Sequence, residues 1–461
     1  LKNPSMVAIH KYFDEYYVPN NYAMVLVGDL DFEKTIQLVD EYFGTFEYKE
    51  LPKKEKITEE PMTEIVERTV KSPSAERIQL AWRTDSYGTE NARLAEIVAN
   101  ILSNSGDCGL IDLNINQDQK ALRGIAYQSS FKNYGNFSML IVPKNDQTLD
   151  EAKQLLLDQL DLIKKGDFPD YLIQAIINDF KIQRMKAYET ADGLATALYG
   201  VFINDQTWEE ELNEINEFSK ITKEDVVKFA NDFFRDNYVV IRKEKGENEK
   251  LIRVENPGIT PIKINKEAQS EFLKEILAEK SSEVEPQFLD YSKAIKTDKI
   301  GDKKVSFVEN KYNDIANVYF IFPFGNDHDK ELGFATQVLQ YLGTDKMSAE
   351  ELKKEFFKLG ISNDFRTSPD ELRIVLTGLE ENMPKGIALL KEWLQNAKPD
   401  QNVYENNVKT VLESREIAKK DKARIMTALG NYAKYGAVSR FTDVISEERL
   451  KEIQSEEMTE K

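Results

Sequence analysis

The sequence predicts an α+β protein made of repeated α/β sandwich domains, in which an antiparallel-rich sheet is backed by long helices. Two observations lead to this fold class. Apolar residues recur at helical spacing in long segments and form short runs that are typical of buried strands. The same order of elements also occurs twice, at about 64–245 and again from about 303. Because repeats of supersecondary structure indicate copies of one architecture, we expect two related domains.

The first 46 residues predict a helix, a buried strand and a second helix. The apolar spacing places the helices over 4–17 and Phe32–Phe43, and the run Tyr22–Val27 is expected to be the strand. A single strand cannot bury both of its faces without partner strands. We therefore interpret 1–46 as the C-terminal remnant of a first domain.

The second block, 64–245, has enough strands and helices to close a core of its own, and we interpret it as a second domain. The expected strands are 78–82, 125–131, 136–142 and 237–242. The expected helices are 91–103, 110–118, 149–165, 169–187, 191–203 and 223–234.

Two segments of different composition separate these blocks. Residues 47–63, rich in Glu, Lys and Pro, predict a linker. Residues 246–296 predict a hinge, or a passive spacer, with one helix at 266–278. We expect a third, truncated domain over 297–461. Its expected strands are 318–322, 361–366 and 372–376, and its expected helices are 332–342, 349–359, 385–395 and 402–418.

Composition excludes several classes of protein. The 461 residues are 41% hydrophobic, as in a globular protein, and carry a net charge of −19, which disfavours nucleic acid as a partner. The single cysteine, Cys108, excludes an internal disulfide framework and a cysteine-based zinc site. No apolar run is long enough to span a membrane. Bacterial periplasm and cytoplasm both stay open as compartments.

The start of the chain resembles a known enzyme family. An aromatic pair and Pro-Asn-Asn precede an apolar strand, Gly-Asp and a helix that ends in Tyr-Phe-Gly, at positions Tyr16–Tyr22, Gly28-Asp29 and Tyr42–Gly44. This pattern resembles the end of the first domain in pitrilysin/insulinase-family zinc metallopeptidases. Gln79–Trp82, Gly109–Ile111 and Gly124–Tyr127 look like parts of the second domain of that family.

The resemblance implies a fold and an activity. Four homologous domains would pair into two halves that enclose a chamber, where a zinc ion bound by an inverted His-x-x-Glu-His motif cleaves peptides. The motif glutamate would take a proton from zinc-bound water. This motif is absent from the chain, so we expect an internal fragment without it, in which zinc belongs to the parent protein. The resemblance implies that 1–46 is the remnant of the catalytic domain, that 64–245 is a non-catalytic domain and that 297–461 is an inactive, truncated one.

We assign no catalytic or metal-binding residue within the chain, and its substrate-binding residues are unknown. Its two histidines, His10 and His328, are far apart in sequence, and Leu332 stands where His328-Asp329-Lys330-Glu331 would need a second histidine. The segment Gln337–Tyr341 occupies the helix that corresponds to the motif helix, but Gln and Tyr are poor zinc donors.

Two hypotheses for function therefore stay open. In the first, the chain is the non-catalytic portion of a zinc metalloendopeptidase, and its partners are peptide substrates and the missing first and fourth domains. In the second, the parent is a non-catalytic scaffold or partner subunit of the same family. An upstream His-x-x-Glu-His motif would separate the two hypotheses.

Overall fold

The computed structural model describes residues 5–53, 58–247, 263–280, 285–286 and 288–461. The described residues form two units. One unit comprises residues 5–6 and the described part of 249–312, and the other comprises 7–247 and 313–461. We describe each unit by itself.

The first segment contains helices α1 (Met6–Tyr16) and α2 (Phe32–Phe43), with a 3₁₀ turn at Pro19–Asn21 between them. Both predicted helices are confirmed, and α2 has the predicted bounds. The predicted strand Tyr22–Val27 is wrong, because this segment has no hydrogen-bonded partner strand within the described residues. A strand needs such a partner to satisfy its backbone groups.

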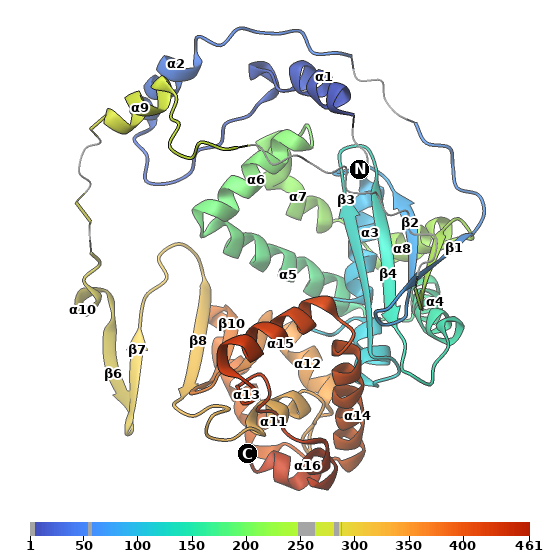
Figure 1. Cartoon of the computed structure of the whole chain (residues 1–461). Coiled ribbons are helices and arrows are strands. Elements are labelled where there is room, and N and C mark those ends of the chain that lie inside the picture. Colours follow the sequence, from blue (N-terminus) through green and yellow to red (C-terminus); the bar gives the residue numbers. More distant parts are fainter. Residues whose placement is uncertain (1–4, 54–57, 248–262, 281–284, 287) are drawn as a thin grey trace. The chain divides into compact units, whose positions relative to one another are not determined.

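The sheet of the second block has five strands in the order β1-β5-β2-β4-β3. The β1–β5 pair is parallel, and the other pairs are antiparallel. Figure 1 shows β3 and β4 side by side in this sheet. β1 is absent from the predicted strands because only two of its seven residues, Val66 and Val70, are apolar. The strands are β1 (Val66–Ser72), β2 (Arg77–Thr84), β3 (Arg123–Ser130), β4 (Gly135–Val142) and β5 (Val239–Lys245).

Helices α3 and α4 pack against this sheet. Local sequence fixes both ends of α4. The Thr148 side chain forms a capping box with Glu151 at its start, and Gly166 ends the helix at a positive φ of 72°. The predicted helix 110–118 is a short π-helix at Asp112–Gln117. The α-helices are α3 (Glu90–Leu102), α4 (Leu149–Lys165), α5 (Tyr171–Tyr188), α6 (Ala191–Ile203), α7 (Trp208–Phe218) and α8 (Lys223–Phe233).

The core of this block centres on Trp82. Alternate residues of β2 point inward, so that Ile78, Leu80 and Trp82 are all buried. The Trp82 ring lies 4.6 Å from the ring of Tyr238 and 5.2 Å from that of Phe234, measured between centroids. Phe234 and Tyr238 lie near the end of the second block, and their packing against Trp82 joins that end to β2.

The third block repeats the arrangement of the second. Its sheet has the order β8-β10-β9, and both pairs are antiparallel, which matches the order β2-β4-β3. The predicted fold class is thereby confirmed. The strands are β8 (Ile315–Phe322), β9 (Ile361–Thr367) and β10 (Leu372–Leu379). The helices are α11 (Leu332–Leu339), α12 (Ala349–Lys358), α13 (Met383–Asn396), α14 (Gln401–Ala418), α15 (Lys422–Tyr435), α16 (Glu447–Glu452) and α17 (Ser455–Thr459).

The other unit holds short elements and exposed side chains. A hairpin forms from β6 (Lys296–Ile300) and β7 (Lys303–Phe307), and neither strand is predicted from the sequence. The helix predicted at 266–278 begins later, as α9 (Glu271–Ala278), and a short α10 (Tyr291–Ala294) follows it. Much of the predicted hinge lies outside the described residues, so the domain bounds stay predictions.

The core position of Trp82 gives a first prediction. Trp82→Ala should lower the free energy of unfolding by about 3–5 kcal/mol, because it leaves a cavity among packed aromatic rings. The measurement is urea-induced unfolding followed by circular dichroism. Phe131→Ala, at a site where the ring is 60% exposed, is the control and should cost less than about 0.5 kcal/mol. Equal effects of the two variants would contradict the assignment of the core.

Candidate functional site

The residues considered as metal ligands from the sequence do not come together. His10 lies exposed on α1, while the His328 ring nitrogen Nδ1 accepts a hydrogen bond from the Gly325 amide at 3.2 Å. Helix α11 ends at Leu339, so Gln340 and Tyr341 lie beyond it and not on the helix as predicted.

No cluster of three or more His, Cys, Asp or Glu side chains suited to a metal ion occurs among the residues that the structure describes. The described residues therefore do not fit the zinc ion that the family resemblance implies. That the chain contributes no metal ligand stays a prediction.

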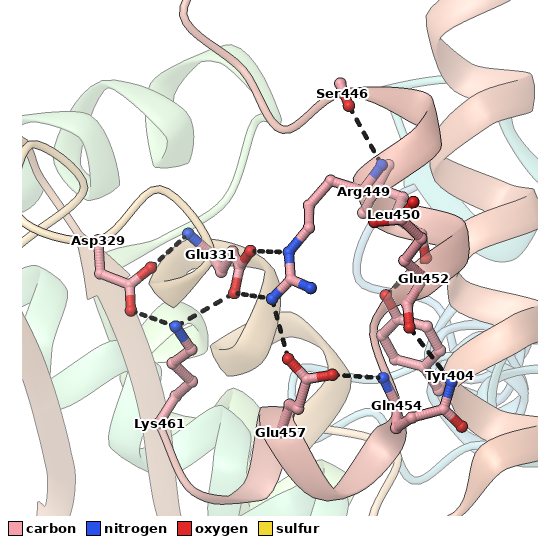
Figure 2. A network of polar contacts seen from close by, with 10 residues as sticks. All are labelled: Asp329, Glu331, Tyr404, Ser446, Arg449, Leu450, Glu452, Gln454, Glu457 and Lys461. Carbon is pink, nitrogen blue, oxygen red and sulfur yellow. Dashed lines mark hydrogen bonds and ion pairs between the residues drawn. The ribbon is translucent and has the colours of Figure 1, made fainter.

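Asp329 and Glu331 belong instead to a network of ion pairs, which Figure 2 shows. Arg449 Nε donates to Glu331 Oε1 at 2.7 Å, and Lys461 Nζ donates to Asp329 Oδ2 at 2.6 Å. A second nitrogen of Arg449 reaches Glu457 at 2.9 Å. The bond from Arg449 lowers the pKa of the Glu331 carboxyl. The network therefore joins the start of α11 to α16 and α17.

The second block contains a polar cleft of about 430 Å³ between helix α3 and strand β3. We call it the α3–β3 cleft. Three of its lining residues, Glu96, Asn100 and Asn104, are spaced by four positions, which places them along one face of the helix and the turn after it. Asp112, Tyr127 and Gln128 line it as well. The cleft therefore has carboxylates and amides on the helix side and a strand edge opposite.

Side chains cap the β3 edge that faces this cleft. The Asn116 amide donates to the Gly124 carbonyl at 2.9 Å and accepts from the Gly124 amide at 2.7 Å. Ser103 Oγ accepts from the Ala126 amide at 3.1 Å. Since β3 is the last strand of the sheet, these groups would otherwise be open to another strand. A peptide therefore cannot pair with Gly124–Ala126 unless it displaces both caps.

Glu96 differs from the other acidic residues of the cleft. No hydrogen bond or ion pair reaches its carboxylate from any part of the chain that the structure describes. The pKa of Glu96 is raised to about 7, mainly by burial and in addition by the nearby charge of Glu214, while Arg184 acts in the opposite direction. Glu96 keeps some exposed surface and lines the cleft, so its carboxyl group opens there.

The arginines near Glu96 are engaged by other carboxylates. Arg93 pairs with Glu214 and Arg184 with Glu211, each at 3.3 Å. The Tyr188 hydroxyl also donates to Glu211 at 3.1 Å. These contacts hold α3, α5 and α7 together, and they leave Glu96 without a cation in direct contact.

The surroundings of Asp112 and Cys108 suit a structural role for both residues. Asp112 Oδ2 accepts from the backbone amides of Asn104 at 2.9 Å and Gly109 at 3.0 Å, which shapes the loop after α3. Burial raises the pKa of Asp112 to about 6 and that of the Cys108 thiol to about 12. A buried thiol with so high a pKa is a poor nucleophile.

A second hollow, of about 500 Å³, lies in the first segment and is lined mainly by apolar side chains of residues 24–44. Met24, Leu26 and Phe32 are among them, and each is about half exposed or more. This surface contains the segment that was predicted to be a buried strand. It has an apolar lining and no polar group that could orient a substrate, apart from Thr35 and Asp40.

The sequence analysis missed Glu96, although a signal for it exists. Helix α3 is apolar on most of its faces, yet it carries Glu96 between the buried Ala95 and Ile97. A charged residue within such a run is uncommon unless it is paired or functional. The spacing of Glu96, Asn100 and Asn104 could have identified the polar face of the cleft.

Comparisons with known proteins agree with the resemblance seen in the sequence. Residues 7–180 match the family described as the peptidase M16 inactive domain. A search of curated proteins finds no match. Within the described residues, no helix has the length and apolar character needed to cross a membrane.

Three crystal structures are similar to this chain. A protease from Helicobacter pylori has 15% identity and a TM-score of 0.48, covering 53% of this chain and 60% of that one. The periplasmic protease PqqL from Escherichia coli has 12% identity and a TM-score of 0.43, covering 99% of this chain and 54% of that one. A mutant of the ferredoxin protease FusC, in complex with Arabidopsis ferredoxin, has 11% identity and a TM-score of 0.47, covering 99% of this chain and 54% of that one. The chain thus spans 54–60% of the length of these proteins.

The ion-pair network of Figure 2 gives a second prediction. Arg449→Met should speed hydrogen exchange of the backbone amides in α16 and α17 several-fold, because it removes the link between these helices and Glu331. Mass spectrometry of exchanged peptides measures this. Arg440→Met, which breaks an exposed pair with Asp327, is the control. Unchanged exchange in 447–459 would show that the network does not hold these helices.

The raised pKa of Glu96 gives a third prediction. The pKa of Glu96 is about 7 in the folded state and about 4.5 in the unfolded chain, so the folded state binds this proton more tightly. The free energy of unfolding should therefore fall as pH rises from about 4.5 to 7. Glu96→Gln removes this penalty. The variant should exceed the wild type by on the order of 1–3 kcal/mol at pH 8 and match it near pH 4.5.

Urea unfolding at both pH values measures this difference. Glu90→Gln, at an exposed position in the first turn of the same helix, is the matched control and should follow the wild type. Asp112 keeps its own dependence on pH in every variant, so only the difference between variants is informative. A constant difference between Glu96→Gln and the wild type at all pH values would contradict the prediction.

Proposed function

Since residues 7–180 match the family described as the peptidase M16 inactive domain, we propose that this chain is the non-catalytic portion of a zinc metalloendopeptidase. In this proposal the parent protein degrades or processes peptides inside a chamber, and this chain supplies part of the chamber wall. The observation that carries the proposal is the match to an inactive domain of a peptidase family. The described residues lack a cluster of metal ligands, so the proposal assigns the zinc ion to another part of the parent.

The chain would act by binding and by excluding water. Peptide substrates would lie against its surfaces while zinc and its base, supplied by another domain, activate water for attack on the peptide bond. A closed chamber keeps bulk water from the reaction and strengthens polar interactions within it. The segment 246–296 would serve as the hinge between the two halves, and closing the halves would commit the substrate.

The fourth prediction tests this function on the parent protein and on this chain. The full-length parent should contain about one zinc ion per molecule and cleave a quenched fluorescent peptide, and a chelator should abolish the cleavage. The 461 residues alone should bind no zinc tightly and cleave nothing. Zinc content is measured by atomic absorption after dialysis, and cleavage by fluorescence.

Two results would redirect the proposal. A parent without zinc and without an upstream His-x-x-Glu-His motif would support a non-catalytic scaffold or partner subunit. Stoichiometric zinc in the 461 residues alone, lost in His10→Ala or His328→Ala, would place a metal site within this chain.

A further inference from the structure

We propose that the α3–β3 cleft binds the cationic side chain of an arginine or lysine in a peptide, with Glu96 as its counter-charge. The inference rests on the proposed function, because it names one feature of the peptides that the parent would hold. It can be tested by binding alone, without any cleavage.

The argument for a cation starts from Glu96. Its carboxylate lines the cleft and has no hydrogen bond or ion pair within the described parts of the chain. A carboxylate removed from water without a partner lowers the stability of the fold. Arg93 and Arg184 pair with Glu214 and Glu211, so neither arginine forms an ion pair with Glu96. A cation that enters the cleft would compensate this charge.

The other lining groups favour the same class of ligand. Asp107 and Asp112 add carboxylates, and Asn100, Tyr127 and Gln128 add neutral oxygens that can accept hydrogen bonds. The one basic residue in the lining, Arg123, is exposed on β3. A guanidinium or ammonium group carries several donors and no acceptor, and so matches a cleft rich in acceptors.

The capped edge of β3 determines how the ligand enters. Asn116 and Ser103 occupy the backbone groups of Gly124 and Ala126, so the ligand does not extend the sheet at these residues. A single long side chain can reach Glu96 without displacing either cap. The volume of about 430 Å³ is within the range of sites that hold small ligands.

The charged groups around Glu96 set the pH dependence. Glu214 on α7 opposes ionisation of Glu96, and Arg184 on α5 favours it. Arg93, on the same helix as Glu96, is paired with Glu214. A bound cation favours the ionised carboxylate, so affinity should rise as pH increases through about 7.

The fifth prediction uses the 461-residue chain and two fluorescein-labelled pentapeptides. One has arginine at its centre and alanine elsewhere, and the other has citrulline, the neutral isostere, in place of arginine. Fluorescence anisotropy at pH 8 should show that the arginine peptide binds roughly tenfold more tightly than the citrulline peptide. This preference should be lost in Glu96→Gln and should weaken at pH 6. Glu90→Gln should retain it.

Each alternative outcome is informative. A preference that persists in Glu96→Gln would indicate general attraction to a chain with net charge −19, and would overturn the proposal. Equal or undetectable binding of the two peptides to the wild type would overturn it as well. Circular dichroism shows whether Glu96→Gln is folded, and Glu96→Asp, which keeps the charge on a shorter side chain, should restore part of the preference. None of these results depends on the zinc content or activity of the parent, so the two proposals can fail separately.

Discussion

The antiparallel ladder between β2 and β4 organises the second block. Its register places Trp82 opposite Phe137 and Leu80 opposite Met139, and all four side chains are buried. Because strand residues alternate between faces, one register determines which side chains meet the helices. β3 is added to the far side of β4, and α3 lies along β3. The position of the α3–β3 cleft thus follows from the ladder, and the β8–β10 pair repeats the same pattern in the third block.

Helix α3 combines two requirements that oppose each other. Eight of its thirteen residues are buried and stabilise the block, while Glu96 places a carboxylate on the same helix at a cost to stability. Asn100 and Asn104 continue its polar stripe, and each donates a side-chain hydrogen bond back to a helix carbonyl. Perturbed ionisable groups of this kind concentrate at functional sites. Arg93 of α3 pairs with Glu214 and Arg184 of α5 pairs with Glu211, so both arginines have carboxylate partners other than Glu96.

The sequence predicts the long amphipathic elements well and the context-dependent ones poorly. The bounds of α2, α4 and α6 agree with the prediction, because helical apolar spacing and capping residues such as Thr148 act locally. Strand β1 and the hairpin β6–β7 escape prediction, since their residues are mostly polar and only pairing defines them. Tyr22–Val27 shows the reverse error: its composition is that of a strand, but no described segment pairs with it.

The candidate site, like the fold, can be predicted from the sequence only in part. The absence of the zinc motif and the wide separation of His10 and His328 can be seen in the sequence alone. The cleft cannot, because it depends on which partner each acidic residue finds. Glu211, Glu214 and Glu331 look no different from Glu96 in sequence, yet each of the three is paired with an arginine and Glu96 is not. Electrostatic compensation of this kind is a property of the folded arrangement.

The sheets of the second and third blocks differ in how many neighbours their first long strand has. β2 has hydrogen-bonded neighbours on both sides, β5 and β4, whereas β8 has one only, β10, among the described strands. On its other side no described strand pairs with β8, and Tyr319 and Ile321 of this strand are more than half exposed. An edge of this kind can act as a template for strands of other molecules. We therefore expect edge-to-edge pairing through residues 316–322 if the 461 residues associate with one another in concentrated solution.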